Sequence, residues 1–126
     1  MRGIRIGTAE IYRQIERIPG IADSAAVAWQ GGDDDQIVLF IQTSAGTSLD
    51  AELAATIRTE LRRNASPRHV PDLIVAVTDL PRTATGKVSE AAIRAALHGN
   101  AVANRDSLAN PQALDAIGAD ALKRAY

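Results

Sequence analysis

A polar segment that ends in a single lysine is the first place in this sequence where chemistry could occur. Pro81-Arg82-Thr83-Ala84-Thr85-Gly86-Lys87 has little apolar content, and Gly86 lets the backbone turn sharply before the lysine. A lysine ammonium suits phosphate or carboxylate oxygens where negative charge develops. The segment is not a phosphate-binding P-loop, which requires Gly where Pro81 stands and Ser or Thr where Val88 stands. Taken alone, Lys87 is more simply a solvated lysine, because most lysines are exposed.

A second segment that could bind an anion lies at the start of the chain. Gly3-Ile4-Arg5-Ile6-Gly7-Thr8-Ala9-Glu10 places two glycines around Arg5, just before a predicted helix. Backbone amides at a helix amino terminus favour anions, and glycines permit a ligand to approach closely. On these residues alone, an ordinary turn into a helix is the simpler interpretation.

The elements that must position these segments follow from apolar spacing. The expected helices cover residues 8–18, 49–63 and 89–97, with Ser89 as an N-cap and Glu90 and Arg94 as an intrahelical pair. The expected strands cover residues 25–29, 37–41 and 73–77. The prolines of 66–71 make a stiff connector before the third strand.

This order of elements predicts an α+β domain, a small sheet of about three strands with helices packed on it. The lysine segment then lies in a loop between a strand and a helix. Beyond Gly99 large apolar residues become sparse, although Asn110-Pro111 could start one more helix. We therefore expect a domain over residues 1–98 and a carboxy-terminal extension over 99–126.

Composition limits the function. With 126 residues, 46% of them apolar, the chain fits one compact core. Its 14 basic and 15 acidic residues give no overall field that would attract nucleic acid or an anionic membrane. It has no cysteine, which excludes disulfides, thiolate catalysis and cysteine-based zinc sites. No apolar run is long enough to cross a bilayer, so we expect a soluble, cytoplasmic protein with no nucleic-acid or membrane partner.

Some polar residues receive no catalytic or metal role. Asp33-Asp34-Asp35 is better explained as a solvated loop than as a metal site, because no coordination pattern surrounds it. His69 and His98 lack metal-ligand spacing and are expected to be structural or solvent-facing. Trp29 follows strand alternation and is expected in the core. We therefore expect no metal ligand in this chain.

Taken together, the two glycine-containing segments resemble signature motifs of the adenylate-forming ligases, and the chain is similar to the acetoacetyl-CoA synthetases among them. The resemblance covers nearly the whole chain and weakens after about Ile117. It rests on Arg5-Ile6-Gly7-Thr8-Ala9-Glu10-Ile11-Tyr12, Ser66-Pro67-Arg68-His69-Val70-Pro71, Leu80-Pro81-Arg82-Thr83, Thr85-Gly86-Lys87, Leu97-His98-Gly99, Asn104-Arg105-Asp106-Ser107-Leu108-Ala109-Asn110-Pro111 and Ala113-Leu114-Asp115.

The resemblance implies the mobile carboxy-terminal domain of an ATP-dependent ligase that joins a carboxylic acid, here acetoacetate, to CoA and releases AMP and pyrophosphate. It implies that Lys87 is catalytic in adenylate formation, and that Gly3, Arg5, Arg62 and Gly86 bind the cofactors ATP and CoA. Arg63 is the alternative to Arg62, and a solvated helix end is as good an explanation of either.

The implied partner is the large amino-terminal adenylation domain of the same enzyme, which would hold most contacts to Mg²⁺, ATP and the small carboxylate. This chain lacks that domain and should be inactive alone. The alternative is a free-standing α+β binding or regulatory module without activity. An RNA-binding module fits less well, because the few aromatic residues form no base-stacking platform.

Overall fold

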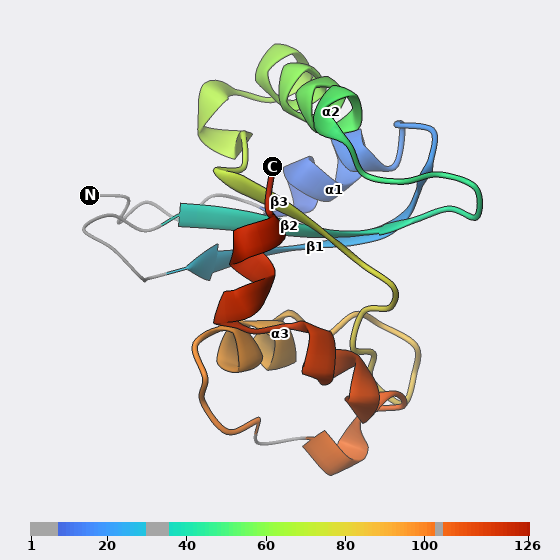
Figure 1. The fold of residues 1–126 in the computed structure, drawn as a ribbon. Coiled ribbons are helices and arrows are strands. Elements are labelled where there is room, and N and C mark those ends of the chain that lie inside the picture. The colour runs from blue at the N-terminus through green and yellow to red at the C-terminus, as the bar shows by residue number, and fades with distance from the viewer. Residues whose placement is uncertain (1–7, 30–35, 103–104) are drawn as a thin grey trace.

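The computed structural model describes residues 8–29, 36–102 and 105–126. Its longer elements are helix α1 (Thr8–Ile15), strands β1 (Ile21–Trp29) and β2 (Gln36–Thr43), helix α2 (Ala51–Asn64), strand β3 (Leu73–Val77) and helix α3 (Glu90–Leu97) (Figure 1). Short 3-10 helices are η1 (Pro67–His69), η2 (Arg105–Ser107), η3 (Pro111–Ala116) and η4 (Ala119–Arg124). This arrangement confirms the predicted α+β class. Gly3, Arg5 and Asp33-Asp34-Asp35 lie outside the described residues.

The strands form one sheet in the order β1-β2-β3. β2 pairs antiparallel with β1 and parallel with β3, so that Phe40 lies between Ala25 and Val75. A parallel pair needs a crossover connection, and α2 lies within the connection between β2 and β3. The sheet is therefore mixed, with β2 in its centre.

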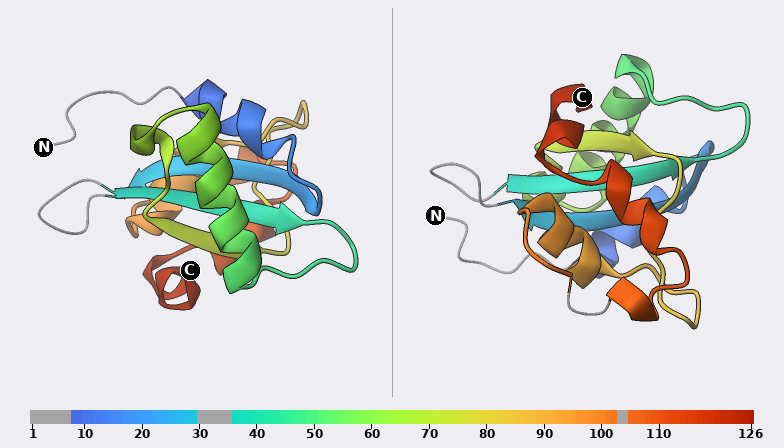
Figure 2. Two further views of the ribbon diagram at one scale, coloured as in Figure 1. Left: turned by 90° about the horizontal axis from the view of Figure 1, so that it is seen from above. Right: turned by 60° about the horizontal axis from the view of Figure 1, so that its bottom comes forward.

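Helices cover both faces of this sheet (Figure 2). On one face, α1 and α2 pack on the inward side chains of alternate strand residues, among them Leu39, Ile41 and Ile74. On the other face, α3 and the carboxy-terminal segment pack on Val38, Phe40 and their neighbours. Alternation along a strand sends successive side chains to opposite faces, so β2 contributes to two hydrophobic clusters at once.

Local signals explain where the helices begin and end. The Asp50 side chain caps α2 by accepting from the backbone N–H of Leu53, and Ser89 caps α3 as predicted by accepting from that of Ala92. α1 is shorter than predicted, because turns replace the helix after Ile15. Gly20 then adopts φ of 94°, where a Cβ would lie 2.9 Å from a methyl group of Thr47.

The carboxy-terminal segment of residues 105–126 lies against the sheet. The helix predicted at Pro111 is the short 3-10 helix η3. Ile117 and Ala121 are buried in the same cluster as Phe40, and Tyr126 exchanges backbone hydrogen bonds with Ile74 of β3. This segment therefore shares the core of the sheet.

Candidate functional site

The segment that carries Lys87 is a small hairpin between β3 and α3. Arg82 and Val88 form an antiparallel bridge at its base. The backbone N–H of Thr83 donates to the carbonyl oxygen of Lys87 at 2.8 Å, and that of Gly86 donates to the carbonyl oxygen of Thr83 at 2.9 Å. Gly86 has φ of 92°, a left-handed conformation that other residues rarely adopt. The sequence therefore gives the loop a defined turn just before the lysine.

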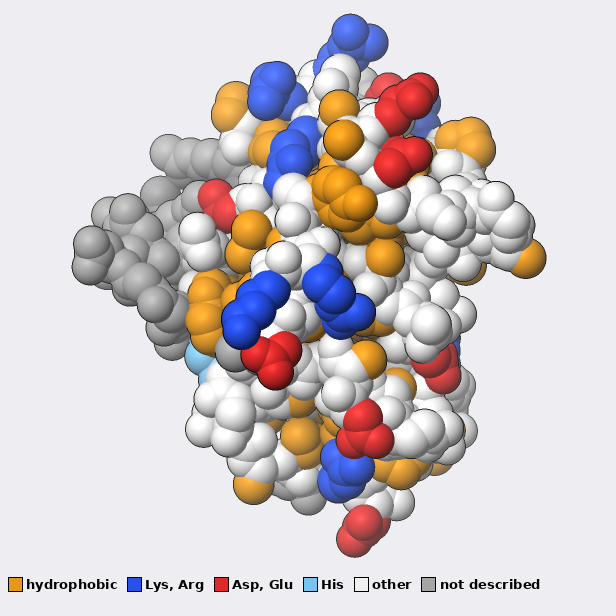
Figure 3. Space-filling view, viewed as in Figure 1, with side chains coloured by type: hydrophobic (Ala, Val, Ile, Leu, Met, Phe, Trp, Pro, Cys, Tyr) orange, Lys and Arg blue, Asp and Glu red, His pale blue; other side chains and the backbone are white. Residues whose placement is uncertain are grey.

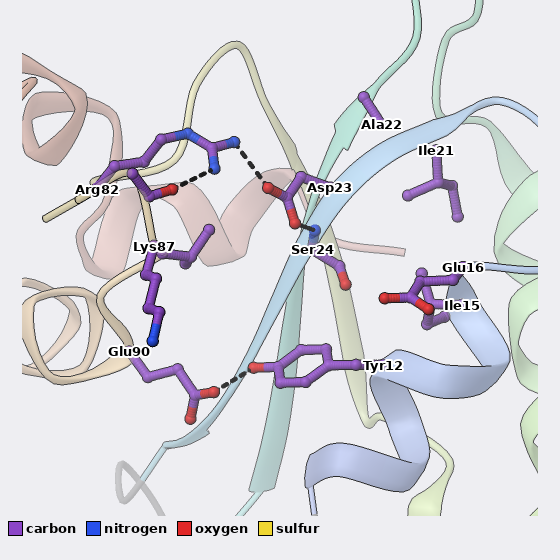
Figure 4. Close-up of a pocket in the computed structure, with 12 residues that line it drawn as sticks. Tyr12, Ile15, Glu16, Ile21, Ala22, Asp23, Ser24, Arg82, Lys87 and Glu90 are labelled. Carbon is purple, nitrogen blue, oxygen red and sulfur yellow. Dashed lines mark hydrogen bonds and ion pairs between the residues drawn. The ribbon is translucent and has the colours of Figure 1, made fainter.

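Lys87 is exposed and lies beside an open depression of about 480 Å³. The side chains around it come from α1, β1 and the hairpin with the start of α3 (Figure 4). Acidic groups face the same space from Glu16, Asp23 and Glu90. The exposed lysine is therefore accessible to a ligand from outside the chain.

Arg82 ties the hairpin to the sheet. Its guanidinium forms an ion pair with Asp23 of β1 at 2.7 Å and donates to the side-chain oxygen of Gln42 at 3.3 Å. It also donates to the carbonyl oxygen of Gly86 at 3.3 Å. Arg82 thus connects the turn next to Lys87 with two strands.

Tyr12 connects α1 with the start of α3. Its hydroxyl donates to the Glu90 carboxylate at 2.6 Å and accepts from the backbone N–H of Ala26 at 2.9 Å. Burial raises the pKa of Tyr12 well above its ordinary value, the Glu90 carboxylate raises it further, and the Ala26 N–H opposes both. The predicted pairing of Glu90 with Arg94 is absent among the ion pairs of the described residues, because this carboxylate faces Tyr12 instead.

Arg62 and Arg63 lie in the last turn of α2 and are both exposed. Arg62 lines a separate depression together with Arg58 and Tyr126. On this face, basic side chains lie over α2 and the carboxy-terminal segment, with acidic side chains beside them (Figure 3). The structure therefore does not place Arg62 beside Lys87, and the two belong to different surfaces of the chain.

The two histidines have local structural contacts. Nδ1 of His69 lies 2.6 Å from the Ser66 hydroxyl. Nδ1 of His98 lies 2.8 Å from the Arg94 carbonyl oxygen, and its ring is 5.0 Å from that of Trp29. Across residues 8–29, 36–102 and 105–126, no three acidic or histidine side chains group as metal ligands would. No helix in these ranges is long and apolar enough to cross a membrane.

Comparison with known proteins decides the family. Residues 10–87 match the family model of the AMP-binding enzyme C-terminal domain. The chain belongs to this family. It is 46% identical over 113 residues to the acetoacetyl-coenzyme A synthetase of Rhizobium meliloti (strain 1021), covering 90% of this chain and 17% of that protein. It is 44% identical over 115 residues to the acetoacetyl-CoA synthetase of Caenorhabditis elegans, covering 90% of this chain and 16% of that protein.

Solved structures agree with this assignment. The acetoacetyl-CoA synthetase from Streptomyces lividans superposes with a TM-score of 0.82 at 34% identity, covering 98% of this chain and 19% of that one. An acyl-CoA synthetase from Brucella canis shares the fold with a TM-score of 0.61 at 24% identity and covers only 68% of this chain. This AMP-binding C-terminal domain thus spans about a sixth of the relatives it matches.

The raised pKa of Tyr12 predicts how the stability of the domain depends on pH. The folded state keeps the phenol neutral above about pH 10, where the unfolded chain releases its proton. The free energy of unfolding should therefore be unaffected by Tyr12 titration below about pH 10 and should fall as pH rises above it. In Tyr12→Phe that alkaline fall should be shallower, although the variant is less stable at pH 8 by about 1 kcal/mol. Urea unfolding at a series of pH values measures both effects, and parallel curves for the two proteins would contradict them.

Proposed function

We propose that this domain is the carboxy-terminal part of a full-length ligase that converts acetoacetate, ATP and CoA to acetoacetyl-CoA, AMP and pyrophosphate. The observation that supports it best is identity of 46% and 44% to two acetoacetyl-CoA synthetases across 90% of this chain. The partner is the amino-terminal adenylation domain of the same enzyme, which holds most contacts to ATP, Mg²⁺ and the small carboxylate. The isolated chain is inactive, and the complete enzyme is cytoplasmic.

Lys87 acts in the first half-reaction. There a carboxylate oxygen forms a bond to the α-phosphorus of ATP, while the bond from that phosphorus to pyrophosphate breaks. Both reactants are anionic, so a cation that reaches the carboxylate and the α-phosphate lowers the energy of the transition state. The exposure of Lys87 on a hydrogen-bonded turn supports this role, and Gly86 lets the backbone approach the nucleotide.

The Gly3-Ile4-Arg5 loop acts in the second half-reaction, when the domain presents another surface to the active site. Gly3 lines the tunnel for the pantetheine arm of CoA, and Arg5 lies near its phosphates. This loop precedes α1 in the sequence and lies outside the described residues. A domain that changes orientation between the half-reactions could present the loop in one of them and Lys87 in the other.

Replacing Lys87 should separate the two half-reactions in the full-length enzyme. Lys87→Ala should lower the rate of acetoacetyl-adenylate formation on the order of 100- to 1000-fold, because one transition-state cation is lost. Thioester formation from supplied acyl-adenylate should change little. Pyrophosphate release and thioester formation measure the two steps.

Lys123→Ala is the matched control. Lys123 is the only other lysine of the 126-residue sequence, is exposed and pairs with Asp120. Equal loss of both steps would refute this division, and Gly3→Leu should show the opposite selectivity.

Arg62 is proposed to contact the 3'-phosphate of CoA, with Arg63 as the alternative. The depression that Arg58 and Arg62 line together supports a phosphate contact on this surface. Arg62→Ala should raise KM for CoA about tenfold, as expected for one exposed phosphate contact, and leave KM for dephospho-CoA unchanged. Arg63→Ala is the matched control. If only Arg63→Ala discriminates between the two thiols, the contact belongs to Arg63. If neither does, α2 does not bind this phosphate.

A free-standing binding module is the competing function, and native size distinguishes it. Immunoblotting and mass spectrometry of source-cell extract should detect this sequence in a polypeptide several times larger than 13.3 kDa. A native species of 13.3 kDa without a partner chain that restores ligase activity would contradict the proposed function.

A further inference from the structure

The carboxy-terminal segment touches the hairpin of Lys87 and also packs against the rest of the domain. Leu108 and Leu114 are buried in a cluster with Ala92 of α3. Ile117 and Ala121 are buried in the larger cluster under the sheet. Val102 also packs against the cluster of Ala92, so the segment is anchored on both sides of residues 108–110, which touch the hairpin.

Residues 108–109 pair with the outer edge of the hairpin as a short third strand. Thr83 and Leu108 form an antiparallel bridge, and the backbone N–H of Ala109 donates to the carbonyl oxygen of Arg82 at 2.8 Å. This edge would otherwise leave backbone groups of the hairpin without a protein partner. The base of the catalytic loop thus depends on residues about 25 positions further along the chain.

The side chain of Asn110 adds the most specific contacts. Its oxygen accepts from the backbone N–H of Arg82 at 2.7 Å. Its amide nitrogen donates to the Asp79 carboxylate at 2.7 Å and to the carbonyl oxygen of Leu80 at 2.8 Å. Because the Arg82 N–H can only donate and the Leu80 carbonyl can only accept, only this orientation of the amide satisfies all three groups.

Arg82 links Asn110 to the turn that precedes the lysine. Its backbone is held by Asn110, while its guanidinium binds Asp23 and the carbonyl oxygen of Gly86. Gly86 directly precedes Lys87. A continuous series of hydrogen bonds therefore runs from the carboxy-terminal segment to the turn that aims the lysine.

We propose that Asn110 is a positioning residue for Lys87, and that the carboxy-terminal segment serves adenylate formation by holding the lysine hairpin in one geometry. The inference rests on the role proposed above for Lys87. A flexible lysine on a two-stranded hairpin would spend part of its time outside reach of the α-phosphate. Asn110 and the paired backbone of residues 108–109 restrict that motion at the base of the hairpin.

The test uses the full-length enzyme with Asn110→Ala. Because a misplacement of about 1 Å can cost on the order of 100-fold in rate, kcat/KM for adenylate formation should fall about 10- to 100-fold. Thioester formation from supplied acyl-adenylate should stay within about threefold of wild type, because it does not use Lys87. Hydrogen exchange of a peptide covering residues 81–89 should become faster, which reports the loop directly and without substrate.

Four further variants separate positioning from general destabilisation. Gln112→Ala alters an exposed side chain in the same short helix η3 and should change neither measurement. Ile57→Ala removes a buried side chain on the opposite face of the sheet; it should lower Tm without selective loss of adenylate formation. Asn110→Asp places a second carboxylate beside that of Asp79, and because the two repel each other, this variant should behave like Asn110→Ala. Adding Asp79→Asn to this variant restores a hydrogen-bond donor between positions 79 and 110, and the rate of adenylate formation should recover in part.

The outcomes distinguish this inference from the proposed function. If Lys87→Ala abolishes adenylate formation but Asn110→Ala affects both half-reactions equally, or neither, Asn110 is not a positioning residue. Unchanged hydrogen exchange over residues 81–89 leads to the same conclusion. If Lys87→Ala leaves adenylate formation intact, the proposed role of Lys87 fails whatever Asn110 does. If Asn110→Ala does not fold, the test compares Asn110→Asp with the double variant Asn110→Asp/Asp79→Asn. If the double variant does not recover adenylate formation, the inference is overturned.

Discussion

Burial of the central strand on both faces is the constraint on which the rest of this domain depends. Val38, Leu39, Phe40 and Ile41 of β2 are all fully buried, and they alternate between the two hydrophobic clusters. A strand of this kind is stable only if each face of the sheet is covered. α1 and α2 cover one face, whereas α3 and the carboxy-terminal segment cover the other (Figure 1). Covering the second face brings the carboxy-terminal segment against β3 and α3, and places its residues 108–110 next to the hairpin that joins them.

The hairpin of Lys87 is therefore supported from two directions by elements that have a separate packing role. Asp23 and Gln42, at the ends of β1 and β2, hold the Arg82 guanidinium. Asn110, held in place by its buried neighbours in the carboxy-terminal segment, holds the Arg82 backbone. These contacts hold the backbone of the turn before Lys87, whereas the flexible lysine side chain keeps its own rotatable bonds. The same lysine remains exposed at the surface of this domain.

Much of the fold could be predicted from local patterns. Strand β3 has the predicted bounds, and Ser89 caps α3 as its position before an apolar run indicates. The error at α1 arose because apolar spacing continues to Ile18 through turns that bury this residue as a helix would. The turn at Gly86 was predicted from its residue type, whereas the role of Lys87 stays a prediction. Asp23, Gln42, Tyr12 and Asn110 were given no role at the hairpin, because polar residues scattered along the chain give no signal of which partner they meet. The Tyr12 and Glu90 contact spans 78 positions.

The sequence by itself determined the α+β class, the order of its elements and the turn that presents Lys87, since these follow from apolar periodicity, capping residues and the backbone freedom of glycine. It also carried the family resemblance that the comparisons show. Only the tertiary structure decided which side chains surround and hold that turn, and that Arg62 belongs to a different surface. The physical reason is that hydrogen bonds between distant residues depend on how strands pair and helices cross, and a linear pattern of residue types does not encode those distances.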